Sequence, residues 1–309
     1  MKIVMLERRV LGMDVDTSAF STCAKVIEYP VSTNDQVAER IGDADCVVVN
    51  KLLMNEEHLK DCPNLKLILE AATGTDNIDH EYCASRGIKV KNVKGYSTQA
   101  VAQHTFALYF YLSEHLPYYD RYVKDGSYSN QPFFAHFDNY FSELNGKCWG
   151  VVGMGEIGRT VAKIADAFGA KVICCSPSGK KYDTPFEQVD FDTLLKRSDV
   201  ISLHTPLTDK TRNLFGRGEF LKMKKTAWLI NVARGPIVNG AELSEAIDSG
   251  EIAGAGLDVM EKEPIPSDDP LLKIKNSDRI IITPHMAWGS VEARQRLVDD
   301  MFENLKGEL

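Results

Sequence analysis

The sequence has no hydrophobic run long enough to cross a membrane, because no apolar stretch approaches the roughly 20 residues that a bilayer requires. Its first residues, Met1 to Arg9, are typical of a short buried strand and not of a signal peptide, because charge interrupts them at once. We therefore expect neither a membrane partner nor export, and the expected location is the cytoplasm.

Positive charge is also scarce. The 309 residues include 36 Lys and Arg against 44 Asp and Glu, which gives a formal net charge of −8. Broad binding to nucleic acid or to anionic membranes requires an excess of basic residues. The charge balance argues against both kinds of partner and leaves room only for a local basic pocket.

The cysteines lack the spacing of a disulfide framework or a zinc site. They are odd in number, and no two of them form a Cys-x-x-Cys pair. Most lie in apolar stretches, which is typical of reduced core thiols in a cytoplasmic protein, so we expect no metal site. The seven are Cys23, Cys46, Cys62, Cys83, Cys148, Cys174 and Cys175.

What the sequence does contain is enough for two globular domains, with 44% hydrophobic and 26% charged residues over its length. Short runs rich in Val, Ile and Leu alternate with helical stretches, which predicts parallel sheets covered by helices on both faces. In the first half the expected strands are Lys2–Leu6, Lys25–Glu28, Cys46–Val49, Leu65–Leu69 and Ile88–Val90. In the second half they are Trp149–Val152, Lys171–Cys175, Val200–Leu203, Ala227–Ile230, Ile252–Leu257 and Arg279–Ile282.

A long helical pattern runs from Thr98 to about Asp125 and is apolar nearly all round at its start, which predicts a helix buried between the two domains. Residues 126–145 are rich in Ser, Asn and aromatics and predict an irregular connection. A last amphipathic helix, about Ser290–Leu305, is expected to return to the first domain.

The most informative stretch is the glycine turn that follows Trp149–Val152. Its spacing, Gly153-x-Gly155-x-x-Gly158, falls between a strand and a helical pattern. Such a turn offers free backbone N–H groups and the positive end of a helix dipole to a pyrophosphate. We expect a dinucleotide here, held by residues Gly153, Met154, Gly155, Glu156, Ile157 and Gly158; the alternative is a glycine-rich turn without a ligand.

Polar segments follow four later strands, at 204–208, 231–236, 258–264 and 283–288. Ligands of open α/β sheets bind beyond the carboxyl ends of the strands, so these segments are expected to converge. Arg234 can hold a substrate carboxylate, His285 can exchange a proton with the substrate oxygen, and Glu263 can orient the imidazole. Together they suit hydride transfer from a nicotinamide cofactor to a ketone. Singly, each has an ordinary alternative as a surface ion pair, a solvated charge or a loop histidine.

These motifs, in this order, resemble the D-isomer-specific 2-hydroxyacid dehydrogenase family over essentially the whole chain. They are Gly153-x-Gly155-x-x-Gly158, Asn231-x-Ala233-Arg234-Gly235, Asp258-x-x-x-x-Glu263-Pro264 and Thr283-Pro284-His285, with residues 72–79 in the first half. The resemblance implies a flavodoxin-like α/β substrate domain, residues 1–97 plus 286–309, into which a Rossmann-type, doubly wound cofactor domain, residues 98–285, is inserted. It also implies a homodimer formed through the cofactor domains.

The resemblance assigns roles to individual residues. It implies Arg234 as substrate clamp, Glu263 as partner of the histidine and His285 as general acid and base. The backbone around Thr73 and Gly74 is expected to hold the substrate carboxylate. Near the nicotinamide half of the cofactor it implies Thr105, Val232, Ala233, Asp258 and His285, and near the adenosine side His204, Thr205 and Pro206.

One position departs from the NAD-binding members of the family. They are expected to have an acidic residue at the end of the second cofactor-domain strand, where this chain has Ser176. Without a carboxylate there, a 2′-phosphate would not be repelled, and Ser176, Ser178, Lys180 and Lys181 could donate to it. The cofactor is therefore NAD or NADP, with NADP slightly favoured; alternatively, Ser176 binds only the ribose and Lys180 and Lys181 are solvated.

The substrate is less closely defined. Asn50-Lys51, Val101–His104 and Pro284–Trp288 look similar to the hydroxypyruvate reductase/glycerate dehydrogenase branch, which makes Lys51 and Trp288 candidate substrate residues. Alternatively, Trp288 packs the last helix. Pyruvate, branched-chain or aromatic 2-oxoacids stay open because Leu52–Met54 form an apolar run. So do a formate or phosphite dehydrogenase and a non-catalytic NAD(H)-sensing binding protein of the same fold.

Overall fold

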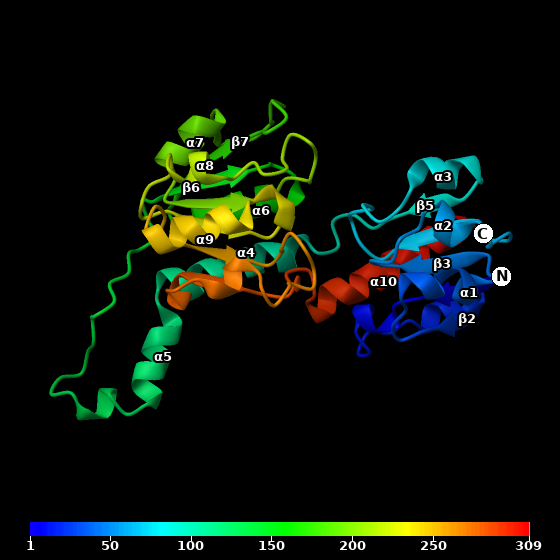
Figure 1. The fold of residues 1–309 in the computed structure, drawn as a ribbon, viewed down its shortest axis with the longest axis horizontal. Coiled ribbons are helices and arrows are strands. Elements are labelled where there is room, and N and C mark those ends of the chain that lie inside the picture. Colours follow the sequence, from blue (N-terminus) through cyan, green and yellow to red (C-terminus); the bar gives the residue numbers. More distant parts are fainter. Residues whose placement is uncertain (309) are drawn as a thin grey trace. The chain divides into compact units, whose positions relative to one another are not determined.

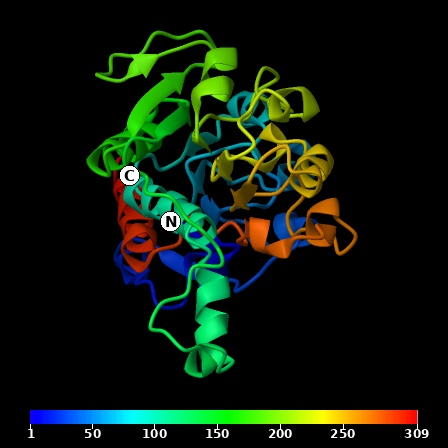
Figure 2. The same ribbon diagram turned by 90° about the vertical axis from the view of Figure 1, so that its left-hand side faces the viewer.

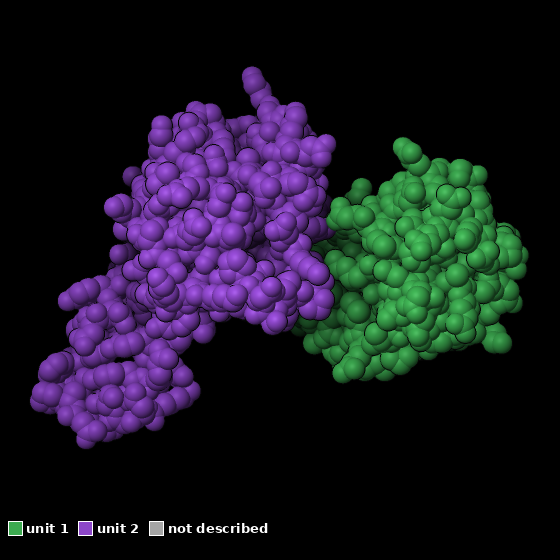
Figure 3. All heavy atoms as spheres, in the orientation of Figure 1, with its two compact units in different colours: residues 1–97, 288–309 green, residues 98–287 purple. Residues whose placement is uncertain are grey.

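The computed structural model describes residues 1–308, which divide into two compact units (Figure 3). The first unit comprises residues 1–97 and 288–309, and the second comprises residues 98–287. Met286 and Ala287, expected in the first domain, group with the second unit because their backbone amides donate to Asp258 of that unit.

Within the described residues, the first unit has one sheet of five parallel strands in the order β2-β1-β3-β4-β5 (Figure 1). This is the flavodoxin-like order, as expected. In the central register, Val4 pairs with Ile27 on one side and with Val47 on the other. The strands are β1 Lys2–Met5, β2 Lys25–Glu28, β3 Cys46–Val49, β4 Leu67–Glu70 and β5 Lys89–Lys91.

The observed β4 begins later than the apolar run that predicted it. Leu65 still belongs to a turn in which its amide donates to Cys62, and pairing with β3 begins only at Leu67, opposite Cys46. At its other end β4 extends to Glu70, opposite Val49, although a charged residue is an unusual end for a buried strand. Glu70 is fully buried there.

Side-chain caps define the helices of the first unit. The Asn55 side chain accepts from the amide of His58 at 3.3 Å, and Ser290 caps the last helix in the same way through Ala293. Thr33 caps a short 3₁₀ turn that precedes the first helix. The helices are α1 Val37–Ile41, α2 Glu56–Leu59, α3 His80–Ser85 and α10 Val291–Lys306.

The second unit has a sheet of seven parallel strands within the described residues, in the order β12-β11-β10-β9-β6-β7-β8. The direction in which strands are added reverses between β6 and β9, which is the switch point of a doubly wound sheet. The strands are β6 Cys148–Val152, β7 Lys171–Cys175, β8 Glu187–Gln188, β9 Val200–Leu203, β10 Trp228–Asn231, β11 Gly254–Leu257 and β12 Ile280–Ile282. The predicted Rossmann-type architecture is confirmed; only β8, which is short and polar, was not predicted.

The long helix predicted from Thr98 is two helices. His115 adopts a left-handed conformation (φ 53°), and Pro117 lies in the first turn that follows, so the chain changes direction between them. The second helix, α5, leads away from the sheet together with residues 126–145, as Figures 1 and 2 both show. The helices are α4 Thr98–Ser113, α5 Leu116–Lys124, α6 Glu156–Ala167, α7 Phe191–Arg197, α8 Arg217–Phe220 and α9 Gly240–Ser249.

Short 3₁₀ turns complete the chain at Arg8–Leu11, Ser18–Thr22, Asn34–Gln36, Tyr128–Asn130, Gly235–Ile237, Pro270–Lys273 and Ser277–Arg279. No helix in residues 1–308 is both long and apolar enough to cross a membrane. All seven cysteines, which lie in this part of the chain, are free thiols, and five of them are buried.

Candidate active site

The glycine turn lies between β6 and α6. Its three glycines differ in what an added side chain would meet. Gly153 has φ 93°, and a Cβ there would lie 2.6 Å from the carbonyl oxygen of His204. A Cβ on Gly158 would lie 2.0 Å from the carbonyl oxygen of Gly153. Around Gly155, in contrast, a Cβ would meet no atom within 4 Å. The fold itself therefore requires the outer two glycines, and the space over the middle one is left open.

The start of α6 suits an anion. Gly155 occupies the N-cap position of this 12-residue helix and supplies no side-chain cap, so the first amides of α6 point toward the open space over Gly155. The nearby carboxylate of Glu156 accepts from the Thr98 hydroxyl at 3.4 Å. The turn thus fits the pyrophosphate of a dinucleotide, with Met154 buried beneath it and Ile157 half-buried.

His204, at the end of β9, faces the same turn through its carbonyl group. Both of its ring nitrogens are buried, and neither has a hydrogen-bond partner within residues 1–308. Burial lowers the pKa of His204 to about 3, so the imidazole is neutral at physiological pH. A buried ring N–H normally has a partner, and a bound group beside the turn would supply one. Thr205 is buried next to it and Pro206 is exposed.

The segment after β7 forms a closed turn. The hydroxyl oxygen of Ser176 accepts from the amide of Lys180 at 3.0 Å and lies 3.2 Å from the Ser178 hydroxyl, and Gly179 has φ 75°. Ser178 and Lys180 are exposed. The end of β7 therefore presents hydroxyls and a cation in place of a carboxylate.

Asn231 shapes the loop that contains Arg234. Its buried side chain accepts from the amide of Ala233 and donates to the carbonyl of Arg234, both at 3.0 Å. A Cβ on Gly235 would lie 1.9 Å from the carbonyl carbon of Met260, so the loops after β10 and β11 are in direct contact. This close approach brings the Arg234 loop against the Glu263 loop. Val232 is buried beside them.

His285 and Glu263 form a hydrogen-bonded pair, as predicted. Nδ1 of His285 lies 2.6 Å from Oε2 of Glu263, while Oε1 of Glu263 accepts from the amide of Met260 at 3.0 Å. The carboxylate is thus fixed at both oxygens and orients the ring. The contact with Glu263 thus engages Nδ1 of the ring.

Asp258 holds the turn that contains His285. Its carboxylate accepts from the Thr283 hydroxyl at 2.6 Å and from the amides of Met286 and Ala287 at 2.9 and 2.8 Å, and its carbonyl accepts from the amide of His285. His285 is in the left-handed region, with φ 54°, which a residue with a side chain rarely adopts. The buried carboxylate stabilises this turn.

Asp258 is ionised despite its burial. Burial by itself would raise the pKa of Asp258, but the hydrogen bonds to the same carboxylate outweigh it and hold the pKa below the ordinary value. In the structure its oxygens bond the His285 turn, and the expected position of Asp258 beside the nicotinamide stays a prediction. Thr105 is fully buried, and its hydroxyl donates to the carbonyl of Val101 within α4.

His104 was not predicted as a site residue. Its Nε2 lies 3.0 Å from the Thr283 hydroxyl and 3.5 Å from Asp258. Because that hydroxyl donates its hydrogen to Asp258, it must accept from His104, which assigns the proton to Nε2. The available signal was a histidine in a largely apolar helix.

The remaining predicted substrate residues belong to the first unit. Lys51 is exposed, and its amide donates to the carboxylate of Glu7 at 3.0 Å. Thr73 donates to the carbonyl of Val93 at 2.8 Å and lies next to Gly74. Trp288 packs edge-on against Tyr96, with ring centroids 6.4 Å apart. These residues lie at or just beyond the carboxyl ends of β3 and β4, apart from Trp288, which precedes α10.

Comparison with known proteins agrees with this geometry. Residues 106–287 match the family model described as D-isomer specific 2-hydroxyacid dehydrogenase, NAD binding domain. The chain belongs to this family.

Within residues 1–308, no group of three His, Cys, Asp or Glu side chains is placed to hold a metal ion.

Relatives within the D-2-hydroxyacid dehydrogenase family cover the chain end to end. A glycerate dehydrogenase of Methylorubrum extorquens is 38% identical over 309 residues, 99% of this chain and 95% of its own length. A hydroxypyruvate reductase of Blautia hydrogenotrophica is 36% identical over 314 residues, 99% of this chain and 96% of its own. The solved structure of an acyclic imino acid reductase in complex with NADPH and D-Arg superposes with a TM-score of 0.87 at 28% identity, covering 100% of this chain and 97% of the other.

The role of Asp258 in this family member can be tested by its contribution to stability. We expect Asp258→Asn to lower the free energy of unfolding by about 2–4 kcal/mol at pH 7, because an amide cannot accept from all of the donors around it. The folded-state pKa is depressed, so this contribution is present above the ordinary value of 3.8 and is lost as the pH falls through the folded value. The deficit should therefore shrink at pH 3 in thermal unfolding followed by circular dichroism. The exposed Asp268→Asn is the matched control, and an equal deficit at both pH values would contradict the assignment.

Proposed function

We propose that the chain catalyses the reversible reduction of a small 2-oxoacid, similar to hydroxypyruvate or glyoxylate, to the D-2-hydroxyacid with NAD(P)H. The observation that carries the proposal is the 2.6 Å contact of Nδ1 of His285 with Glu263, which orients the ring and favours Nε2 as the nitrogen that exchanges a proton with the substrate. The names of the glycerate dehydrogenase and hydroxypyruvate reductase relatives support this substrate class.

In the proposed mechanism the chain positions the ketone and supplies the proton. Arg234 holds the substrate carboxylate in a bidentate pair and polarises the adjacent carbonyl. A nicotinamide held beside the glycine-turn domain's Val232 and Ala233 would supply the hydride that C2 accepts. His285 donates the Nε2 proton to the oxygen on C2, and Glu263 stabilises the imidazolium before transfer. In the direction of oxidation, His285 takes the same proton back.

Residues of the first unit are also proposed to bind the substrate. Backbone amides around Thr73 and Gly74 are suited to the substrate carboxylate, and Lys51 and Trp288 are proposed as further substrate residues. By this proposal the first unit is the substrate domain and the second is the cofactor domain.

Kinetics of single substitutions test the mechanism. With a panel of 2-oxoacids and oxidation of NADH or NADPH as the readout, His285→Gln is expected to lower kcat by about 10²–10⁴-fold, because proton donation is lost. Arg234→Lys is expected mainly to raise KM, by about 10–100-fold, because the bidentate pair is lost. Arg212→Lys, at an exposed position, is the control. Near-normal turnover by His285→Gln would disprove the assignment, and no turnover of any 2-oxoacid by the wild type would favour a binding protein.

The turn after β7 supports NADP over NAD in this proposal. It presents the hydroxyls of Ser176 and Ser178 and the exposed Lys180 and Lys181, without a carboxylate at the end of the strand. A 2′-phosphate gains from nearby cations and hydroxyls, and a carboxylate at this position would repel it.

Substitution of Ser176 alone should shift the cofactor preference from NADPH toward NADH. Ser176→Asp is expected to lower kcat/KM with NADPH relative to NADH by about tenfold or more, because the new carboxylate repels the 2′-phosphate. Lys180→Ala with Lys181→Ala should weaken NADPH binding several-fold in a fluorescence titration, with the exposed Lys196→Ala as control. A large NADH preference in the wild type, or NADPH binding that ignores both lysines, would contradict the proposal.

We further propose that two copies pair through their cofactor domains. We call α5 and residues 126–145 the arm. Large apolar side chains are concentrated on it, and Phe134 and Tyr140 are 90% and 84% exposed. Its exposed apolar side chains are Leu116, Val123, Tyr128, Phe133, Phe134, Phe137, Tyr140 and Phe141. Patches of this kind mark interaction sites.

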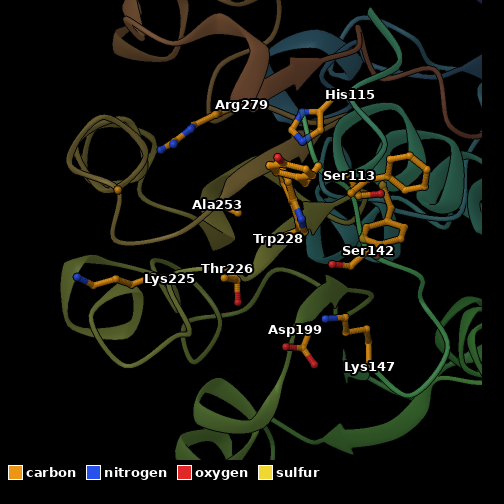
Figure 4. Close-up of a pocket in the computed structure, with 14 residues that line it drawn as sticks. Ser113, His115, Ser142, Lys147, Asp199, Lys225, Thr226, Trp228, Ala253 and Arg279 are labelled. Atoms are coloured by element: carbon orange, nitrogen blue, oxygen red, sulfur yellow. The ribbon is translucent and has the colours of Figure 1, made fainter. Parts of the chain in front are cut away.

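The same unit also has a pocket of about 410 Å³ where the arm returns to the sheet (Figure 4). It lies at the amino ends of the strands, the edge opposite the glycine turn, since Lys147 and Asp199 precede β6 and β9. Aromatic side chains line it, including Tyr109 and Trp228. Each copy thus has both an apolar arm and an aromatic-lined surface, which suits a two-fold, self-complementary interface.

The arm provides a direct test of the dimer. Phe134→Ser with Phe137→Ser is expected to change the mass in solution from that of two chains to that of one, because the apolar contact area is lost. Light scattering after size exclusion measures it. Leu221→Ser, which is exposed outside the arm, is the control. A monomeric wild type, or a doubly substituted protein that stays dimeric, would contradict this interface.

A further inference from the structure

We propose that Glu70 is a positioning residue whose carboxyl group must keep its proton for the two loops of the first unit at residues 50–54 and 71–79 to hold their mutual geometry. Substrate affinity is also expected to fall when this proton is lost, because the two loops contain Lys51, Thr73 and Gly74. This second part rests on the proposed function.

The burial of Glu70 is unusual for an acid. It lies at the end of β4 with no exposed surface. Oε2 accepts from Nδ2 of Asn77 at 3.2 Å, while Oε1 is buried and has no partner in residues 1–308. A carboxylate with a single donor would leave most of its charge uncompensated in the interior. A protonated carboxyl keeps the bond to Asn77 at much lower cost.

Asn77 joins Glu70 to both loops. Its Nδ2 also donates to the carbonyl of Leu52 at 2.9 Å, and its backbone carbonyl accepts from the amide of Met54 at 2.9 Å. From the other side, Nδ2 of Asn50 donates to the carbonyl of Ala71 at 2.6 Å. The two loops are therefore held together by hydrogen bonds, two of which are made by Asn77, the residue that Glu70 contacts.

Taken together, the surroundings of Glu70 oppose the ionisation of its carboxyl group. Burial raises the pKa of Glu70 to about 8. This pKa already includes the smaller contributions of the neighbours: the Asn77 hydrogen bond and the charge of Lys51 lower it, while Glu7 and Asp76 raise it. Helix α10, which packs against β4, buries only apolar side chains, namely Ala293, Leu297, Val298, Met301 and Leu305.

The neighbouring acid Glu7 gives a reason for Glu70 to stay neutral. Its Oε2 accepts from the amides of Asn50 and Lys51 at 2.7 and 3.0 Å, which are bonds that suit a carboxylate. A second negative charge on Glu70 would be repelled by Glu7 and by the carboxylate of a bound 2-oxoacid. Loss of the Glu70 proton is thus expected to loosen the Asn77 contacts and to disfavour an anionic substrate together.

Hydrogen exchange on the free protein tests the structural part without any activity. Wild type, Glu70→Gln and the exposed control Glu81→Gln are compared from pH 6 to 9.5 by mass spectrometry, with correction for intrinsic exchange rates. In the wild type and the control, amides of residues 50–54 and 71–79 should exchange about tenfold faster at pH 9 than at pH 7. In Glu70→Gln, which cannot ionise, the corrected rates should stay constant.

Thermal stability gives a second readout. The folded-state pKa of Glu70 is raised, so its contribution to stability is present below the unfolded pKa and is lost as the pH rises toward the folded value near 8. The Tm of Glu70→Gln relative to the wild type should therefore rise from pH 5 to 8 and then level off. Glu70→Met, similar in size and unable to ionise, should behave alike and serves if the amide variant does not fold.

Kinetics test the substrate part. At saturating cofactor, KM of the wild type should rise about tenfold from pH 7 to 9, and KM of Glu70→Gln should not. Every ionisable group other than Glu70 is common to both proteins, so the difference between them isolates Glu70. Exchange and Tm profiles that run parallel in the two proteins would overturn the inference, as would equal KM profiles. Failure of every 2-oxoacid to turn over would refute the proposed function, and the exchange comparison would still decide the role of Glu70.

Discussion

The candidate active site depends on one buried carboxylate, that of Asp258. It accepts from the Thr283 hydroxyl and from two successive amides after His285, and so holds His285 in a left-handed conformation. Glu263 then needs only to orient the ring about that fixed backbone. Since Asp258 follows β11 and Thr283 follows β12, the parallel pairing of these strands sets the starting distance between the two groups. The chemistry of the loop thus rests on the register of the sheet.

Much of this could be predicted from the sequence, because the strands are continuous apolar runs and the motifs lie where the strands end. The break between α4 and α5 depended on a left-handed His115, and the helical spacing of side chains on both sides conceals it. Asp258 was expected at the site, but its hydrogen bonds to the His285 turn and the contact of His104 with Thr283 could not be predicted, because they join segments far apart in the chain. Glu70 was included in no motif, and only its burial distinguishes it from a surface acid.

Asp258 and Glu70 show how neighbours decide the state of a buried acid. Both follow or end a parallel strand, and both are almost inaccessible to water. Asp258 has several donors, and its pKa is lowered; Glu70 has one hydrogen-bond donor and an acidic neighbour, and its pKa is raised. The number of donors around the carboxyl, more than the burial itself, separates the two.

The glycine turn has a similar division between its positions. Gly153 and Gly158 are required by the packing of the chain on itself, whereas a side chain on Gly155 would touch nothing in the protein. In this glycine turn, the two outer positions are therefore required by the fold, and the middle one leaves room for a ligand. A descendant of this domain that no longer bound a dinucleotide would be free to replace Gly155 while the outer glycines stayed fixed. The middle position alone would reveal that the function had been lost.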